Sequence, residues 1–166
     1  MSLYSKAFCL TIGSFLFLSN TAFADTSTFN RDLGYMNLAS NDAFVFNPRT
    51  HSWSAIQNGR VIRSGPASGG RHYCPDTGRA CRTPTGTFHV ISKGDASCRS
   101  SSYPVGVGGA RMPYCMFFSK YYAIHGYHEV ARYNASHGCI RIRSSDAQWL
   151  NHSFMRIGTK VIVKSY

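Results

Sequence analysis

The segment Ser136-His137-Gly138-Cys139 carries the residue types best suited to covalent chemistry. A cysteine attacks an acyl carbon as its thiolate, and a thiol with a pKa of about 8.5 is only a few per cent ionised at pH 7. A neighbouring histidine takes the proton and holds the ion pair, which lowers the pKa of the thiol. Two histidines are candidates, His125 and His137. This pattern predicts acyl transfer with Cys139 as the nucleophile and His125 as its general base.

Two glycines beside these residues have a physical reason to be there. Gly138 lets the backbone turn tightly, so that the N–H groups of Gly138 and Cys139 can point at the oxyanion of a tetrahedral intermediate. Gly126 has no side chain to shield its carbonyl oxygen, which can hold the second ring nitrogen of His125. A backbone carbonyl would then take the third role of a catalytic triad without an acidic residue.

The elements that must position these residues are mostly strands. The strongest local signal is Asn58-Gly59, a pair typical of a tight hairpin turn. A helix is expected over about residues 146–155, with Ser144 or Ser145 as its cap. The remaining periodic segments indicate strands at residues 43–46, 52–57, 60–63, 87–92, 116–118, 121–124 and 160–164. We predict a mainly β single domain with one or two short helices.

Several motifs follow one another in a fixed order along residues 42–166. They are Thr83-Pro84-Thr85-Gly86, Met112-Pro113-Tyr114, Ile124-His125-Gly126, Ser136-His137-Gly138-Cys139 and Gly158-Thr159-Lys160-Val161. In type and order they resemble the L,D-transpeptidase family, the YkuD-type catalytic domain. The resemblance implies a mixed β-sheet or β-sandwich catalytic domain over residues 42–166.

The resemblance also implies a substrate and a reaction. Cys139 would attack the third residue of a peptidoglycan stem tetrapeptide, D-alanine would leave, and the acyl group would remain as a thioester. An amine would resolve it, giving a 3-3 cross-link or attaching a wall-anchored protein. His125 would be the base, oriented by the carbonyl of Gly126. The motif positions that would shape the pocket or contact substrate are Gly138, His137, Ser136, Arg141 and Tyr114, with neither cofactor nor metal. Arg141 could grip a carboxylate in a bidentate pair.

The cysteine count bears on which thiol is reactive. An exported chain would keep five cysteines: Cys74, Cys81, Cys98, Cys115 and Cys139. Five is odd, so at least one thiol is left over or pairs between molecules. The first four allow three connectivities, and pairing neighbours would close small loops worth about 2.5 and 3 kcal/mol. That choice leaves Cys139 free, but counting alone does not select it.

The N-terminus has the pattern of a signal peptide over residues 1–24. Lys6 supplies the positive charge, residues 7–18 the apolar stretch, and Thr21-Ala22-Phe23-Ala24 the small-residue cleavage site. The apolar stretch is short for a membrane span, so we expect no permanent membrane anchor. Residues 25–41 are polar and are interpreted as a leader. These features predict export to the periplasm or cell-wall space of a bacterium.

The charge is strongly basic. Removing the signal peptide takes away Lys6 and no acidic residue, which leaves 17 Lys and Arg against 7 Asp and Glu and lowers the formal charge from +11 to +10. The basic residues are scattered, without a run of five or six and without an RNA-binding motif, so we expect no nucleic-acid partner. An acidic extracellular polymer such as the wall fits this charge better. We expect a monomer.

Several alternatives stay open. The same thioester could be resolved by water, as in an L,D-carboxypeptidase or a hydrolase that releases wall proteins. An NlpC/P60-type peptidase would have its cysteine before its histidine, the reverse of this order. A non-enzymatic chain would be a basic wall-binding module held by disulfides. Two zinc sites are conceivable, one from His72, Cys74 and Cys81 and one from His125, His128 and His137.

Overall fold

The computed structural model describes residues 41–101 and 109–166. The predicted signal peptide, residues 1–24, and the predicted leader, residues 25–41, lie outside this part of the chain apart from Asn41. Among the described residues, none of the helices is long and apolar enough to cross a membrane.

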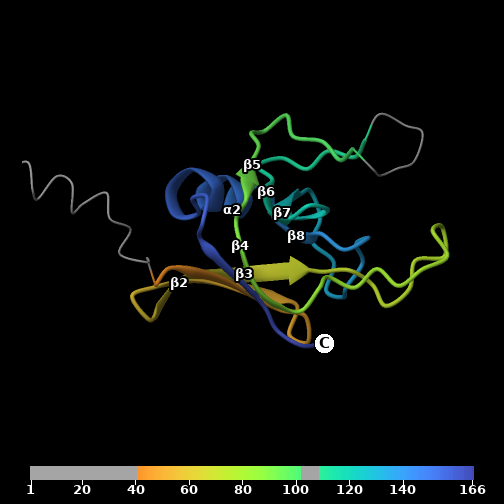
Figure 1. The fold of residues 1–166 in the computed structure, drawn as a ribbon, viewed down its shortest axis with the longest axis horizontal. Helices are drawn as coiled ribbons and strands as arrows, with labels where there is room; N and C mark the ends of the chain where they lie inside the picture. Colours follow the sequence, from red (N-terminus) through yellow and green to blue (C-terminus); the bar gives the residue numbers. More distant parts are fainter. Residues whose placement is uncertain (1–40, 102–108) are drawn as a thin grey trace, which may run out of the picture. The chain divides into compact units, whose positions relative to one another are not determined.

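Nine strands form one sheet in the described part of the chain. They are β1 (Ala43–Asn47), β2 (Ser52–Gln57), β3 (Arg60–Ser68), β4 (Gly86–His89), β5 (Ser92–Lys93), β6 (Met116–Ser119), β7 (Tyr122–Tyr127), β8 (Ile140–Arg143) and β9 (Lys160–Val163). Their order in the sheet is β4-β9-β1-β2-β3-β8-β7-β6-β5 (Figure 1). The pairs β1–β9 and β7–β8 are parallel and the other pairs antiparallel. The predicted mainly β, mixed-sheet fold is confirmed.

The sheet curls round until its two edges meet. The edge strands β4 and β5 follow each other in the chain and are joined by residues 90–91 alone, so they must lie close together. Across this seam, Phe88 of β4 and Phe118 of β6 bring their ring centroids to 5.4 Å. The enclosed core includes the fully buried side chains of Phe44, Trp53, Met116, Leu150 and Val161.

The predicted hairpin at Asn58-Gly59 is present between β2 and β3. Asn58 and Gly59 have φ values of +50° and +77°, the left-handed conformation that a two-residue turn between right-twisted strands requires. The strand after the turn, β3, continues to Ser68, beyond the predicted end at residue 63. Its last residues, Ala67 and Ser68, pair with β8, and this pairing joins the two halves of the sheet.

A short helix, α2 (Ser144–Trp149), runs directly into a π-helical turn, η1 (Leu150–Phe154). The prediction of a helix here is confirmed, but the predicted serine cap is wrong. The N-cap residue is Arg143, which is also the last residue of β8, and no side chain caps the helix. Strand and helix follow without a connecting loop, so both serines fall inside the helix.

Two contacts fix α2 against the sheet. The Asp146 carboxylate, 7% exposed as a residue, accepts a hydrogen bond of 2.7 Å from the guanidinium of Arg63 on β3. On the other side, a Cβ atom at Gly126 would lie 2.9 Å from the Cα atom of Ser144. Gly126 therefore lets the first turn of α2 pack directly on β7.

Candidate active site

The predicted nucleophile and base line one cavity of about 250 Å³. Its wall includes Cys139, His125, His137 and Arg141. Of the cysteines in the described ranges, Cys139 alone lies outside a disulfide. The cavity thus joins a free thiol to both candidate histidines.

The parallel strands β7 and β8 place these residues by simple alternation. Ile124 pairs with Ile140, and His125 with Arg141. Successive side chains on a strand point to opposite faces. Ile124 and Ile140 are therefore in the core, while His125 and Arg141 line the cavity. Cys139 stands one residue before β8, at the start of the same wall.

His125 is buried and uncharged. The residue is 4% exposed, and its Nδ1 atom lies 2.9 Å from the carbonyl oxygen of Gly126. A carbonyl can only accept, so Nδ1 carries the proton and the lone pair is on Nε2. Burial lowers the pKa of His125 to about 4; the Gly126 carbonyl opposes this shift, and the positive charge of Arg141 adds to it. This arrangement gives a neutral imidazole able to receive a proton on Nε2.

Cys139 is held as a thiol. Burial raises the pKa of its sulfhydryl, and the backbone N–H of Ala123 and the charge of Arg141 oppose this shift without cancelling it. The sequence analysis considered an ion pair of thiolate and imidazolium, whereas the raised pKa of the thiol and the lowered pKa of His125 favour the neutral pair in the resting site. Burial penalises both charges, so the thiol and the imidazole are both neutral. Proton transfer must then accompany attack on the substrate.

The turn before Cys139 depends on Gly138 and Ser136. Gly138 has φ +130°, and a Cβ atom there would lie 2.5 Å from the ring of Tyr122. The Ser136 hydroxyl donates to the carbonyl of Cys139 at 2.5 Å and accepts from the N–H of Gly138 at 3.0 Å. Ser136 thus holds the turn, where the sequence suggested a substrate contact. Because Ser136 engages the Gly138 N–H, the expected oxyanion donor that remains is the N–H of Cys139.

His137 and Arg141 have different partners. The Nε2 atom of His137 lies 2.6 Å from a carboxylate oxygen of Asp76. The guanidinium of Arg141 stacks 4.3 Å from the ring centroid of Tyr127, while its Nε atom is buried without a hydrogen-bond partner. Burial lowers the pKa of Arg141. The positive charge of this guanidinium on the cavity wall is suited to an anionic ligand.

Comparison with known protein families shows which family the chain belongs to. The family model of the YkuD domain, the L,D-transpeptidase catalytic domain, matches residues 41–163. The chain belongs to this family. No curated protein matches the chain.

Solved L,D-transpeptidases have a similar fold. An L,D-transpeptidase from Xylanimonas cellulosilytica is 28% identical with a TM-score of 0.66, over 85% of this chain and 70% of that chain. One from Mycobacterium smegmatis is 22% identical with a TM-score of 0.61, over 76% of this chain and 59% of that one. L,D-transpeptidase 3 from Mycobacterium tuberculosis, in complex with a faropenem-derived adduct, is 24% identical with a TM-score of 0.61, over 76% of this chain and 61% of that one. The chain thus spans less than two thirds of the two mycobacterial chains.

One predicted site residue of this L,D-transpeptidase domain lies elsewhere. Tyr114, expected to contact substrate, packs against the core and meets the ring of His152 edge-on at 5.4 Å. It is not among the residues that line the cavity, and it lies in a turn with φ +57°. Tyr122 and Tyr127 line the wall instead, and the sequence analysis missed both. Alternation from His125 along β7 would have found Tyr127.

Two disulfides flank the active-site cavity of the L,D-transpeptidase domain. Cys74–Cys81 and Cys98–Cys115 are the neighbouring pairs that the cysteine count left as one of three options. The first loop supplies Arg79 to the cavity wall. Each disulfide therefore ties a loop next to the free thiol.

Neither zinc site considered from the sequence is assembled. Cys74 and Cys81 are joined in a disulfide and offer no thiolate pair. In the described part of the chain, the only group of three potential ligand atoms within 4.8 Å is that of Cys74, Asp76 and His137, which includes the same disulfide sulfur. His125 and His128 do not join His137 in such a group.

Proposed function

We propose that this L,D-transpeptidase domain acts on peptidoglycan stem peptides through a thioester on Cys139. The observation that carries the proposal is the pairing of a free thiol with a buried, neutral histidine whose proton is fixed on Nδ1, in one cavity. This is the arrangement that general-base activation of a weak nucleophile requires.

The first half-reaction forms the thioester. The Sγ atom of Cys139 attacks the carbonyl carbon of the third residue of a stem tetrapeptide, and its proton passes to Nε2 of His125. The oxyanion that forms accepts a hydrogen bond from the N–H of Cys139. The intermediate then breaks its peptide bond, and the D-alanine amine takes the proton from His125 and leaves.

The second half-reaction returns the enzyme to its starting state. An amine from a neighbouring stem, or from a wall protein, attacks the thioester and gives its proton to His125. The carbon–sulfur bond breaks, and the proton returns to Cys139. The product is a 3-3 cross-link or a protein joined to the wall. If water takes the place of the amine, the same site is an L,D-carboxypeptidase or a hydrolase that releases wall proteins.

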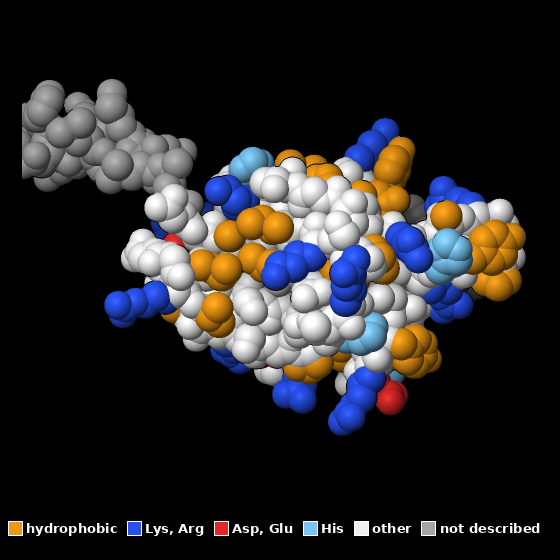
Figure 2. Space-filling view, turned by 90° about the horizontal axis from the view of Figure 1, so that it is seen from below, with side chains coloured by type: hydrophobic (Ala, Val, Ile, Leu, Met, Phe, Trp, Pro, Cys, Tyr) orange, Lys and Arg blue, Asp and Glu red, His pale blue; other side chains and the backbone are white. Residues whose placement is uncertain are grey.

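The charge of the chain supports an anionic polymer as substrate. Basic side chains are spread over the face shown in Figure 2, with acidic groups at few places, in keeping with 18 Lys and Arg against 7 Asp and Glu. On the cavity wall, the positive charge of Arg141 is suited to a stem carboxylate. The predicted signal peptide and the two disulfides support a location in the periplasm or cell-wall space, because disulfides persist in oxidising compartments.

The test is intact mass spectrometry of the protein with a disaccharide tetrapeptide. We expect an adduct on Cys139 with loss of D-alanine, absent from Cys139→Ala. A dimer as final product supports transpeptidation, and a tripeptide supports hydrolysis. Because a solved relative holds a faropenem-derived adduct, we also expect faropenem to add covalently to Cys139. A folded wild type without any adduct would refute the enzymatic proposal and favour a wall-binding module.

A further inference from the structure

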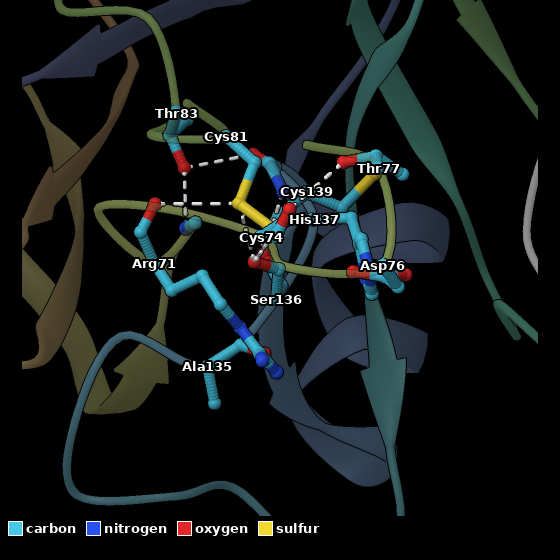
Figure 3. The surroundings of a disulfide bond; sticks show 12 residues. Arg71, Cys74, Asp76, Thr77, Cys81, Thr83, Ala135, Ser136, His137 and Cys139 are labelled. Atoms are coloured by element: carbon cyan, nitrogen blue, oxygen red, sulfur yellow. Dashed lines mark hydrogen bonds and ion pairs between the residues drawn. A yellow bond between two sulfur atoms is a disulfide. The ribbon is translucent and has the colours of Figure 1, made fainter. Parts of the chain in front are cut away.

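The loop closed by the Cys74–Cys81 disulfide packs against residues 135–139, the segment that carries the nucleophile. Figure 3 shows Cys74 and Cys81 beside Ser136 and His137. The two sulfur atoms lie 4.0 and 3.8 Å from the carbonyl oxygen of Ser136. These residues are some sixty positions apart in sequence, so only the fold brings them together.

Hydrogen bonds from both ends of this loop reach the backbone on either side of His137. The N–H of Arg71 donates to the carbonyl of Ser136 at 3.0 Å, and its guanidinium donates to that of Ala135 at 2.8 Å. At the other end, the hydroxyl of Thr83 donates to the carbonyl of Gly138 at 2.7 Å. The backbone on both sides of His137 is thus held by residues that flank the disulfide loop.

The imidazole ring of His137 is held by the tip of the same loop. Its Nε2 atom meets the Asp76 carboxylate at 2.6 Å. An ionised carboxylate only accepts, so this bond places a proton on Nε2 of His137. The hydrogen bond from His137 is the largest cause of a lowered pKa at Asp76, which keeps the carboxylate ionised.

The position of Asp76 depends on the disulfide. Asp76 lies in a turn that begins at Cys74, where the N–H of Cys74 donates to the carbonyl of Arg79 at 2.9 Å and the N–H of Thr77 to that of Cys74 at 3.2 Å. The bond between Cys74 and Cys81 closes this turn against the nucleophile segment. Without it, the turn would lose its covalent closure and depend on hydrogen bonds such as these.

We propose that Asp76 is a positioning residue for acyl transfer, which fixes the ring of His137 on the cavity wall and is itself held there by the Cys74–Cys81 disulfide. The inference rests on the proposed function. His137 lines the cavity two residues before Cys139, so the orientation of its ring sets the shape of the wall beside the reacting sulfur. The side chains of His137 and Asp76 are 26% and 56% exposed. A side-chain contact so open to water adds little to stability, so a change in rate can be separated from a change in folding.

The experiment compares Asp76→Ala, Asp76→Asn and Asp76→Glu in the full chain. We expect Asp76→Ala to slow acylation of Cys139 by the disaccharide tetrapeptide about fivefold, with an unchanged melting temperature. The acylation rate of Asp76→Asn should lie between those of the wild type and Asp76→Ala, because its amide oxygen can still accept the bond. Asp76→Glu should recover part of the rate that Asp76→Ala loses. Nitrogen-15 NMR of the His137 ring should show its proton on Nε2 in the wild type and a mixture of tautomers in Asp76→Ala.

The matched control is Asp95→Ala. Asp95 lies near the other disulfide, and its carboxylate accepts hydrogen bonds from the backbone N–H and the hydroxyl of Ser97. It should change neither the rate nor the ring of His137. Unchanged acylation together with an unchanged tautomer in Asp76→Ala would overturn the inference. If the wild type shows no acylation at all, the proposed function fails, while the tautomer and the rate of Cys139 alkylation by iodoacetamide still test the role of Asp76.

The disulfide is tested by Cys74→Ser with Cys81→Ser. This variant should show the same loss of rate and the same mixed tautomers as Asp76→Ala, whereas Cys98→Ser with Cys115→Ser should leave the His137 ring as in the wild type. A Cys74→Ser/Cys81→Ser protein with the wild-type tautomer would show that the disulfide does not hold Asp76. If that protein does not fold, the Asp76 variants still decide whether Asp76 positions His137.

Discussion

Two histidines line the same cavity in opposite surroundings. His125 is buried, its partner is a neutral backbone carbonyl, and the charge of Arg141 lies beside it. His137 is partly open to water, and its partner is the carboxylate of Asp76. The first environment removes charge and leaves a lone pair on Nε2, whereas the second keeps a proton on Nε2. The two rings therefore present different nitrogens for proton transfer, Nε2 in His125 and Nδ1 in His137, and the proposed mechanism uses Nε2 of His125.

The largest expected effect comes from replacing each histidine in turn by glutamine. Glutamine keeps an N–H that can donate to Gly126 but cannot take a proton. We expect His125→Gln to lower the rate of Cys139 acylation by about a thousandfold, within the range of general-base catalysis. His137→Gln should lower it only about tenfold, because it loses positioning alone. The measurement is adduct formation followed by intact mass.

The control for this comparison is alkylation of Cys139 at a pH high enough to ionise its thiol. There the base is not needed, so both variants should react as fast as the wild type. A greater loss of acylation in His137→Gln than in His125→Gln would reverse the assignment of the base.

The next effect is on stability in acid. The unfolded chain protonates His125 below its ordinary pKa of 6.5, but in the folded protein this pKa is about 4. Between these values the unfolded state binds more protons, so the free energy of unfolding falls as the pH falls, by about 3 kcal/mol in all. The contribution is fully present above pH 6.5. Urea unfolding at pH 7 and pH 4.5 measures it.

His125→Gln removes the titrating group and should flatten this part of the pH dependence. His137→Gln should leave this pH dependence in place, because His125 stays buried in that variant. An equal loss of stability in acid for the wild type and for His125→Gln would contradict the burial argument.

The difference between the histidines also marks what the sequence could predict. Cys139, His125 and Gly126 were found because each role is carried by adjacent residues in a short motif. The pairing of His137 with Asp76 spans 61 positions, and Asp76 stands in a Pro-Asp-Thr-Gly segment that indicates only a turn. A long-range contact of this kind has no local signal.

The electrostatics and two backbone features were missed for similar reasons. The neutral state of the thiol depends on burial, which sequence motifs do not reveal. The strand β8 was missed although Ile140 and Ile142 alternate with two arginines, because the segment is only four residues long. Tyr114 was expected at the cavity but packs against the core, in a turn whose left-handed conformation has no signal in the sequence.

The smallest expected effect concerns Arg141, whose charge acts on the pKa of His125. Its guanidinium lies beside His125 in the register of β7 and β8, and its charge is the least of the three causes acting on that histidine. Arg141→Gln should therefore raise the pKa of His125 only part of the way from about 4 toward 6.5. NMR titration of the His125 ring measures this, with Arg60→Gln on the exposed hairpin as the control, for which no change is expected.

Because Arg141 is also proposed to hold a substrate carboxylate, the same variant should raise KM at a pH where His125 is neutral in both proteins. A raised KM with an unmoved pKa would mean that burial alone keeps His125 neutral and that Arg141 serves the substrate only.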